Sequence, residues 1–313
     1  MQTPVPRIRV GPAGWSYADW QGIVYPAPKP RGFRETEYLA TFFDTLEINT
    51  SFYSPLRAEV VKTWVRSIEH NKNFKFTAKL WQRFTHSRNA THSDEKLFKE
   101  GLNPLMQMDR FGALLLQFPW SFKNTAENRD YLGGLFMQFV EYPLVLEVRH
   151  SSWNEPEILE MLGELHVGFC NIDQPVMGRS LKPSGHSTSG VGYVRLHGRN
   201  YAKWFTSKER SPARYDYLYS MDELEPWVDR IKKIAEISEV TYVVTNNHFQ
   251  GKAVANGLEL VSLLTDQKVA VPDTLVRTYP ELANIAASIP SSQTPARPVQ
   301  TDLLFDTPVL SKN

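Results

Sequence analysis

The chain has 313 residues, of which 42% are hydrophobic and 22% are charged, a balance that supplies a full core and excludes disorder for most of the chain. With 35 basic and 34 acidic side chains the formal charge is +1, which excludes a global field that would draw the protein onto nucleic acid or acidic lipid. Cys170 is the single cysteine, which excludes an internal disulfide. Since no secretory signal or membrane-spanning run is present, we expect a cytoplasmic protein.

Short apolar segments alternate with amphipathic segments along the chain. Nearly continuous apolar strands between helices are typical of a parallel sheet that is buried on both faces. Eight such strands favour a closed α/β barrel of the TIM type, (β/α)8, in a single domain over residues 1–288. An open doubly wound sheet is the alternative, but GPAGWSY after the first strand lacks its glycine-rich phosphate turn. The predicted strands are 8–14, 44–49, 74–79, 112–118, 143–149, 167–173, 191–197 and 240–246.

Helices are predicted between these strands. Residues 57–69 have apolar side chains at helical spacing, and 252–264 supplies the last helix. Asn154 with Pro156 and Glu157 predicts one helix start, and the pair Ser220 and Glu223 predicts a capping box at another. Residues 174–190 are rich in Gly, Pro and Ser, which predicts an irregular connection between strands six and seven. The Pro/Ser/Thr-rich residues 289–313 predict a disordered tail.

Polar side chains collect where the predicted strands end. Because alternate residues of a strand share a face, Glu47 projects with Asn49, Glu147 with Arg149, and Arg195 with His197. In a closed barrel that face is the interior, and the active sites of this fold lie at the carboxyl ends of its strands. Four further polar residues occupy the same level on other strands: Lys79, Gln117, Asp173 and Asn246.

Two arginines beside two carboxylates suit an anionic ligand that is held bidentately, with Glu47 or Glu147 left as general acid or base. His197 could share the proton transfer, since its charge changes near neutral pH. The alternative is a closed ion-pair network that only fills the barrel mouth. Glu47, Glu147, Asp173 and His197 also have the chemistry of divalent-metal ligands, although no HxH or HExxH spacing accompanies them, so a metal stays an open alternative.

The segment after the seventh strand, HGRNYAKWFTSKERSPARY, combines basic and aromatic residues. Such a combination can bind phosphate and stack on bases or sugars, and Arg199 begins it next to the strand. Trp15 and Tyr17 in GWSYADW could form the opposite wall of a pocket. The alternatives are a solvated lid for the basic loop and a core position for the N-terminal aromatics.

Several of these segments together resemble the YecE-like family, known as domain of unknown function 72. The motifs are GWSYADW, LEINTSFY, LLLQFPWSF, LEVRHSSW, YVRLHGRN and the paired Asn246 and Asn247, in one order from about residue 8 to 265. Thr245 departs from the family pattern, which has an aromatic residue before the paired asparagines. The resemblance implies the barrel fold and includes the polar residues at the strand ends in a signature. It implies no established activity.

The tail carries a second resemblance. Gln300, Leu303 and Phe305 in QTDLLF are similar to a peptide that binds the bacterial DNA sliding clamp, and a Pro-rich linker precedes them. Because the motif is short, a chance match is the alternative.

Three functions remain open from the sequence. The first is an enzyme that acts on a phosphate-bearing substrate, with nucleic acid in DNA replication or repair as the example and the tail as the recruiting element. The second is an isomerase, lyase or hydrolase of sugars or sugar phosphates, by analogy with other barrels. The third is a protein that binds a ligand without converting it.

Overall fold

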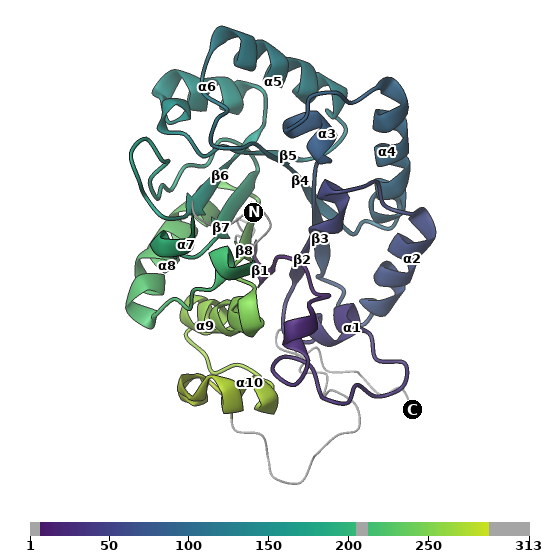
Figure 1. Ribbon diagram of the computed structural model, residues 1–313, viewed down its shortest axis with the longest axis vertical. Helices are drawn as coiled ribbons and strands as arrows, with labels where there is room; N and C mark the ends of the chain where they lie inside the picture. Colours follow the sequence, from purple (N-terminus) through teal and green to yellow (C-terminus); the bar gives the residue numbers. More distant parts are fainter. Residues whose placement is uncertain (1–6, 205–211, 288–313) are drawn as a thin grey trace, which may run out of the picture.

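Eight parallel strands with helices outside them form a nearly closed barrel in the computed structural model, which describes residues 7–204 and 212–287 (Figure 1). The predicted (β/α)8 barrel is therefore confirmed. Every predicted strand is present, with bounds that differ by two residues at most. The strands are β1 Arg7–Pro12, β2 Thr45–Ile48, β3 Lys75–Lys79, β4 Phe111–Gln117, β5 Leu144–Glu147, β6 Gly168–Asp173, β7 Val191–Leu196 and β8 Val240–Thr245.

The barrel closes between β1 and β2. The hydrogen-bonded order is β1-β8-β7-β6-β5-β4-β3-β2, and the two end strands are joined by an isolated parallel bridge between Ala13 and Glu47. A Cβ atom at Gly11 would lie 1.8 Å from the carbonyl oxygen of Thr45, so only glycine allows β1 to approach β2 this closely. This contact brings Glu47, on β2, next to the N-terminal segment.

Helices cover the outside of the barrel (Figure 1). The predicted capping box of α8 is confirmed, with the Ser220 backbone N–H donating to Glu223 Oε2 at 3.0 Å. The predicted helix start at Pro156 and Glu157 is confirmed, but its N-cap is Glu155, and Asn154 Oδ1 instead lies 2.7 Å from His186 Nε2. The helices are α1 Glu35–Leu39, α2 Ala58–Ser67, α3 Gln82–Thr85, α4 His92–Gln107, α5 Ala126–Gln138, α6 Pro156–Glu164, α7 Tyr201–Trp204, α8 Met221–Ile237, α9 Lys252–Thr265 and α10 Asp273–Thr278.

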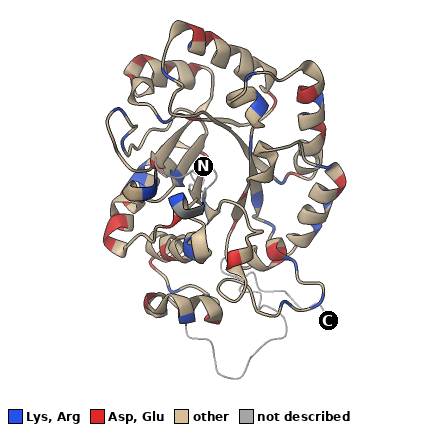
Figure 2. Cartoon of the chain, in the orientation of Figure 1, with Lys and Arg blue, Asp and Glu red and all other residues tan. Residues whose placement is uncertain are grey.

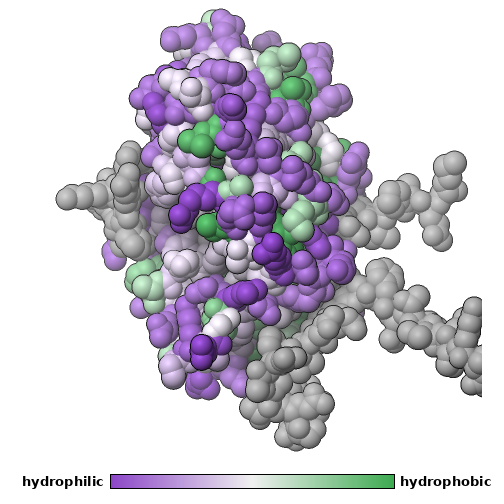
Figure 3. All heavy atoms as spheres, turned by 90° about the vertical axis from the view of Figure 1, so that its right-hand side faces the viewer, coloured by the Kyte–Doolittle hydropathy of each residue, from purple (hydrophilic) through white to green (hydrophobic). Residues whose placement is uncertain are grey.

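The connection between β6 and β7 contains no helix, as predicted for residues 174–190. Lys, Arg, Asp and Glu are distributed over the outer helices with both signs interspersed (Figure 2). The face that carries α2 and α4 is mostly hydrophilic, with small separate hydrophobic areas (Figure 3). Within the described ranges, none of the helices has both the length and the apolar character needed to cross a membrane.

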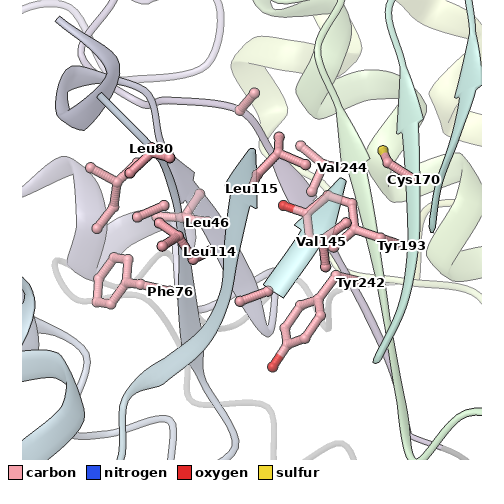
Figure 4. Close-up of a cluster of buried hydrophobic side chains, with 14 of the residues drawn as sticks. Leu46, Phe76, Leu80, Leu114, Leu115, Val145, Cys170, Tyr193, Tyr242 and Val244 are labelled. Carbon is pink, nitrogen blue, oxygen red and sulfur yellow. The ribbon is translucent and has the colours of Figure 1, made fainter. Parts of the chain in front are cut away.

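The hydrophobic core consists of two clusters of buried side chains, which fill the barrel and the layer between strands and helices. Figure 4 shows part of it, with Leu46 and Leu114 close together and Tyr193 beside Tyr242, whose ring centroids are 6.0 Å apart. The Tyr193 hydroxyl marks the boundary between the apolar and the polar part of the interior. It lies 3.0 Å from Glu47 Oε2 and 2.9 Å from Thr77 Oγ1. Above this level, toward the carboxyl ends of the strands, the interior is charged.

Candidate functional site

The carboxyl ends of four strands bring five charged side chains together inside the barrel: Glu47 from β2, Lys79 from β3, Glu147 and Arg149 from the end of β5, and Arg195 from β7. The side chains of Glu47, Glu147 and Arg195 have no exposed surface. Those of Lys79 and Arg149 are each 12% exposed, so they form the part of the cluster that solvent can reach. The alternation of side chains therefore placed these five residues correctly.

Arg195 links the two carboxylates. Its Nη2 lies 2.7 Å from Glu47 Oε1, and its Nη1 lies 2.5 Å from Glu147 Oε2. A guanidinium group matches carboxylates in this planar geometry, and such pairs are stable in a protein interior when their remaining hydrogen-bonding atoms are also satisfied. The mutual pairing expected for a closed ion-pair network is thus present for Arg195 and both carboxylates.

Both oxygens of Glu147 are occupied. Oε2 accepts from Arg195, while Oε1 lies 2.6 Å from Arg149 Nη2. Burial raises the pKa of Glu147, but the adjacent Arg195 and Arg149 outweigh it and hold this pKa well below its usual range. Glu147 is therefore ionised at neutral pH and has no free oxygen with which to accept a further proton.

His197 lies beside this ion pair as a neutral imidazole. Its Nε2 is 3.2 Å from Arg149 Nη2 and 3.3 Å from Glu147 Oε1, and its Nδ1 is 2.9 Å from the side-chain amide of Asn246. Burial lowers the pKa of His197 well below its usual value, and the nearby Arg149 adds to the effect. Since the Asn246 side-chain NH2 can only donate, Nδ1 acts as an acceptor, and the ring proton belongs on Nε2, where Glu147 Oε1 can accept it.

Lys79 differs from the two arginines because its ammonium group is not fully paired. Its Nζ is 3.6 Å from Glu47 Oε1, longer than a hydrogen bond, and 5.9 Å from the Phe52 ring centroid. Among the described residues, no hydrogen-bond acceptor contacts this nitrogen. Burial lowers the pKa of Lys79 to about 8, with a further lowering by Arg195 that Glu47 partly opposes.

The cluster carries an excess of positive charge. Lys79, Arg149 and Arg195 contribute three positive charges against the two carboxylates, and the neutral His197 adds none. Two buried atoms of the described site also have no hydrogen-bond partner in the protein, Nε of Arg195 and Oδ1 of Asn49. A donor-rich, partly unsatisfied cluster of this kind favours a ligand that is anionic and carries hydroxyl groups.

Aromatic rings form one wall above the charges. The Tyr17 and His248 rings stack at 4.4 Å between centroids, and Tyr215 follows at 4.9 Å from His248. Trp204 lies 6.4 Å from Tyr215 and also covers the Arg149 guanidinium at 5.8 Å. Sequence reasoning missed His248, although its place directly after the paired asparagines was a usable signal.

Asn49 and Gln117 also belong to the mouth of the barrel. The Asn49 amide donates to the Tyr17 hydroxyl at 3.3 Å, which places it between the aromatic wall and the cluster. Gln117 is the register partner of Glu147 in the neighbouring strand, so the two side chains share a face of the sheet. Sequence reasoning also missed Gln174, whose Oε1 accepts from Arg149 Nη1 at 3.1 Å.

Asp173 and Arg199 are not part of this cluster. Cys170 faces Glu147 at 4.0 Å, so Asp173, three residues later, faces the opposite side of β6. There it accepts from the Trp227 indole of α8 at 2.5 Å and from Arg199 at 2.9 and 2.7 Å. Arg199 also donates to Glu223 at 3.1 Å, so its guanidinium is fully engaged outside the barrel.

Asn247 and Trp15 also lie away from the cluster. The Asn247 amide donates to the Tyr217 carbonyl at 2.8 Å and to Asn256 Oδ1 at 2.7 Å, between the barrel and α9. Trp15 packs edge-on against Trp64 of α2, with ring centroids 5.0 Å apart. Its position agrees with the alternative prediction that Trp15 is a core residue and not part of a pocket wall.

Two predicted binding segments cannot be placed. Of the basic loop 198–215, residues 205–211 lie outside the described residues, and so do Gln300, Leu303 and Phe305 of the clamp-like peptide. In the described part of the chain, no three His, Cys, Asp or Glu side chains are grouped as a metal ion would require. His197 and the two carboxylates are instead held by arginines.

Comparison with known proteins finds consistent similarity over most of the chain. The family described as "Protein of unknown function DUF72" matches residues 9–281. The UPF0759 protein YunF of Bacillus subtilis is 30% identical over 275 residues, which cover 82% of this chain and 94% of YunF. The crystal structure of a DUF72 family protein from Thermotoga maritima is 29% identical, with a TM-score of 0.73 over 83% of this chain and 99% of that one. One from Enterococcus faecalis, 24% identical, has the same fold with a TM-score of 0.72 over 85% of this chain and 97% of its own.

Proposed function

This chain belongs to the DUF72 family of proteins of unknown function, and we propose that it is an enzyme that binds a small phosphate-bearing substrate in the barrel mouth and transfers protons through Lys79. The observation that carries the proposal is the incompletely paired ammonium of Lys79 inside a cluster with excess positive charge. The barrel fold by itself indicates no reaction, so the proposal rests on the geometry of these side chains.

Phosphate fits the charge of the cluster. Arg149 and Lys79 are its partly exposed cations, and both can donate to a phosphate group that enters from the carboxyl ends of the strands. Arg195 is less accessible because it is fully buried between Glu47 and Glu147. We therefore assign phosphate contact to Arg149 and Lys79, and assign Arg195 the role of holding the carboxylates in place.

The limited exposure favours a small substrate over a polynucleotide. Four central residues of the mouth, Glu47, Glu147, Arg195 and His197, have no exposed side-chain surface, and Trp204 covers Arg149. A backbone phosphate of a polynucleotide would have to reach charges that the described residues largely enclose. The unsatisfied Oδ1 of Asn49 could accept a hydrogen bond from a substrate hydroxyl, so a sugar phosphate suits both features.

Lys79 is better suited to proton transfer than either carboxylate. Glu147 has both oxygens paired with arginine, and Glu47 accepts from Arg195 and lies near the Tyr193 hydroxyl. The lowered pKa of Lys79, about 8, lets it exchange a proton close to neutral pH. His197 can help to hold Glu147 and Arg149 in position, because its Nε2 lies 3.3 Å from Glu147 Oε1 and 3.2 Å from Arg149 Nη2.

Calorimetric titration with inorganic phosphate and with a set of sugar phosphates tests the proposal. We expect Lys79→Met and Arg149→Met each to weaken binding by about 10- to 100-fold, since each removes a charged hydrogen bond worth roughly 1.5–3 kcal/mol. Lys75→Met is the matched control. Lys75 lies on the same strand as Lys79, but it pairs with Asp109 instead of with the cluster.

Two results would contradict the proposal. One is the absence of measurable phosphate binding by the wild-type protein, and the other is equal binding by the wild type and both cluster variants. If a single-stranded oligonucleotide bound more tightly than every small phosphate and depended on the same two residues, the small substrate would be wrong and nucleic acid would replace it.

A further inference from the structure

We propose that Lys79 is also a nucleophile, which forms a covalent imine with a carbonyl group of the substrate. This inference rests on the proposed function and deepens it, because it narrows the substrate class to phosphate-bearing aldehydes and ketones. In the reacting complex Arg149 alone keeps the phosphate contact, and Lys79 reacts with the carbonyl group in its neutral form. It depends on the position of Lys79 at the end of β3, where no acceptor among the described residues lies within hydrogen-bond distance of its amine.

The surroundings of Lys79 are those of a reactive lysine. Its side chain is 12% exposed, so it is largely buried but a small ligand can still reach it. A lysine becomes nucleophilic when burial or a neighbouring cation favours its neutral form. Both conditions are met here, because burial and the Arg195 and Arg149 guanidinium groups lower the pKa of Lys79 toward neutrality.

Lys75 shows what a structural lysine looks like on the same strand. Four residues earlier and therefore on the same face of β3, it lies 2.5 Å from Asp109 Oδ1 and 2.6 Å from the Asp109 carbonyl oxygen. Its ammonium is held by two acceptors, whereas that of Lys79 has one carboxylate at 3.6 Å. The difference in pairing singles out Lys79 as the lysine whose lone pair can be made available.

The proposed step needs no other reactant. The neutral Nζ of Lys79 attacks the carbonyl carbon, and the carbonyl π electrons become an oxyanion that takes a proton. The resulting carbinolamine loses its hydroxyl group as water after a second proton transfer, and a carbon–nitrogen double bond forms. Solvent, which reaches the 12% exposed side chain of Lys79, can carry the proton that nitrogen loses to the departing oxygen, so no net proton is consumed. Addition of water reverses the sequence.

Reductive trapping tests the imine. The full-length protein is incubated with dihydroxyacetone phosphate, treated with sodium borohydride and analysed by intact mass and peptide mapping. We expect one reduced adduct on the peptide that contains Lys79, suppressed by excess inorganic phosphate. Lys79→Arg keeps the charge and should lose the adduct, while Lys75→Arg, the matched control, should keep it.

The outcomes separate this inference from the proposed function. If the wild-type protein binds inorganic phosphate but gives no adduct at Lys79, the imine is wrong and phosphate binding stands. An adduct that survives Lys79→Arg, or that phosphate does not suppress, also overturns the imine. If inorganic phosphate does not bind to the wild-type protein, the proposed function is wrong, whether or not a reduced adduct forms.

Discussion

Arg195 Nη2 lies 2.7 Å from Glu47 Oε1, and neither side chain has any exposed surface. The same guanidinium holds Glu147, so one side chain from β7 joins β2 and β5, neither of which is its neighbour in the sheet. Because both carboxylates are paired through Arg195 while Lys79 is not fully paired, the cluster has both a structural function and a chemical one. The predictions below separate the two.

Replacement of Arg195 with methionine should destabilise the protein by about 3–5 kcal/mol, because two buried carboxylates lose their common partner. Urea unfolding followed by circular dichroism measures the loss. Lys62→Met is the control, since Lys62 pairs with Glu59 on the exposed surface of α2 and its loss should change stability little. Similar stabilities for the two variants would show that Arg195 is not needed to compensate the carboxylates.

The contribution of Glu147 to stability should disappear in acid. Its pKa is lower in the folded protein than in the unfolded chain, so the stabilisation is present above the unfolded value of 4.5 and is lost as the pH falls through the folded value. Glu147→Gln should therefore be less stable than the wild type near pH 6, with a gap that narrows toward about pH 3. A gap of constant size over this range, measured by urea unfolding, would contradict the lowered pKa.

Anion binding should weaken as the pH rises through about 8, because Lys79 then loses its charge. Sulfate is a suitable probe, since its own charge does not change in this range. Titrations between about pH 6.5 and about pH 9.5 should show the decline in the wild type and a flat profile in Lys79→Arg, whose guanidinium stays charged. An identical decline in both proteins would assign the titration to another group.

The sequence predicted the part of the site that depends on local alternation. The ends of apolar strands carry the polar residues Glu47, Glu147, Arg149 and Arg195. The alternation of side chains along a strand therefore places them in the barrel interior. Strand β6 has no such signal, because Cys170, Ile172 and their neighbours are all buried on both faces. Asp173 was therefore grouped with the mouth although it faces α8.

Contacts between distant segments could not be predicted in the same way. The stacking of Tyr17 on His248 joins the first and last parts of the barrel, and nothing local to either residue indicates it. The pairing of Lys79 also depends on side chains from three other strands. The sequence predicted that these charges meet, but only the structure shows that both arginines contact a carboxylate at hydrogen-bond distance while Lys79 does not.

The hydrogen bonds of Asp173 on the outside of the barrel should contribute to the stability of the fold but not to ligand affinity. Trp227→Phe keeps the packing of α8 and removes the indole donor to the buried Asp173 carboxylate. We expect a loss of about 1–3 kcal/mol in the free energy of unfolding and unchanged phosphate affinity. If phosphate binding weakened in this variant as much as in Arg149→Met, Asp173 would contribute to the binding site, as the sequence predicted.

The clamp-like peptide remains a prediction, because Gln300, Leu303 and Phe305 lie outside the described residues. A peptide of this kind binds through a glutamine and spaced apolar side chains, so changing all three to alanine should remove most of the contact surface. In a pull-down with a purified bacterial sliding clamp, we expect the wild-type protein to be retained and the triple variant to be lost. A control with Thr301, Asp302 and Lys312 changed to alanine should bind normally, since it spares the motif side chains. Equal retention of wild type and triple variant would show that QTDLLF does not bind the clamp.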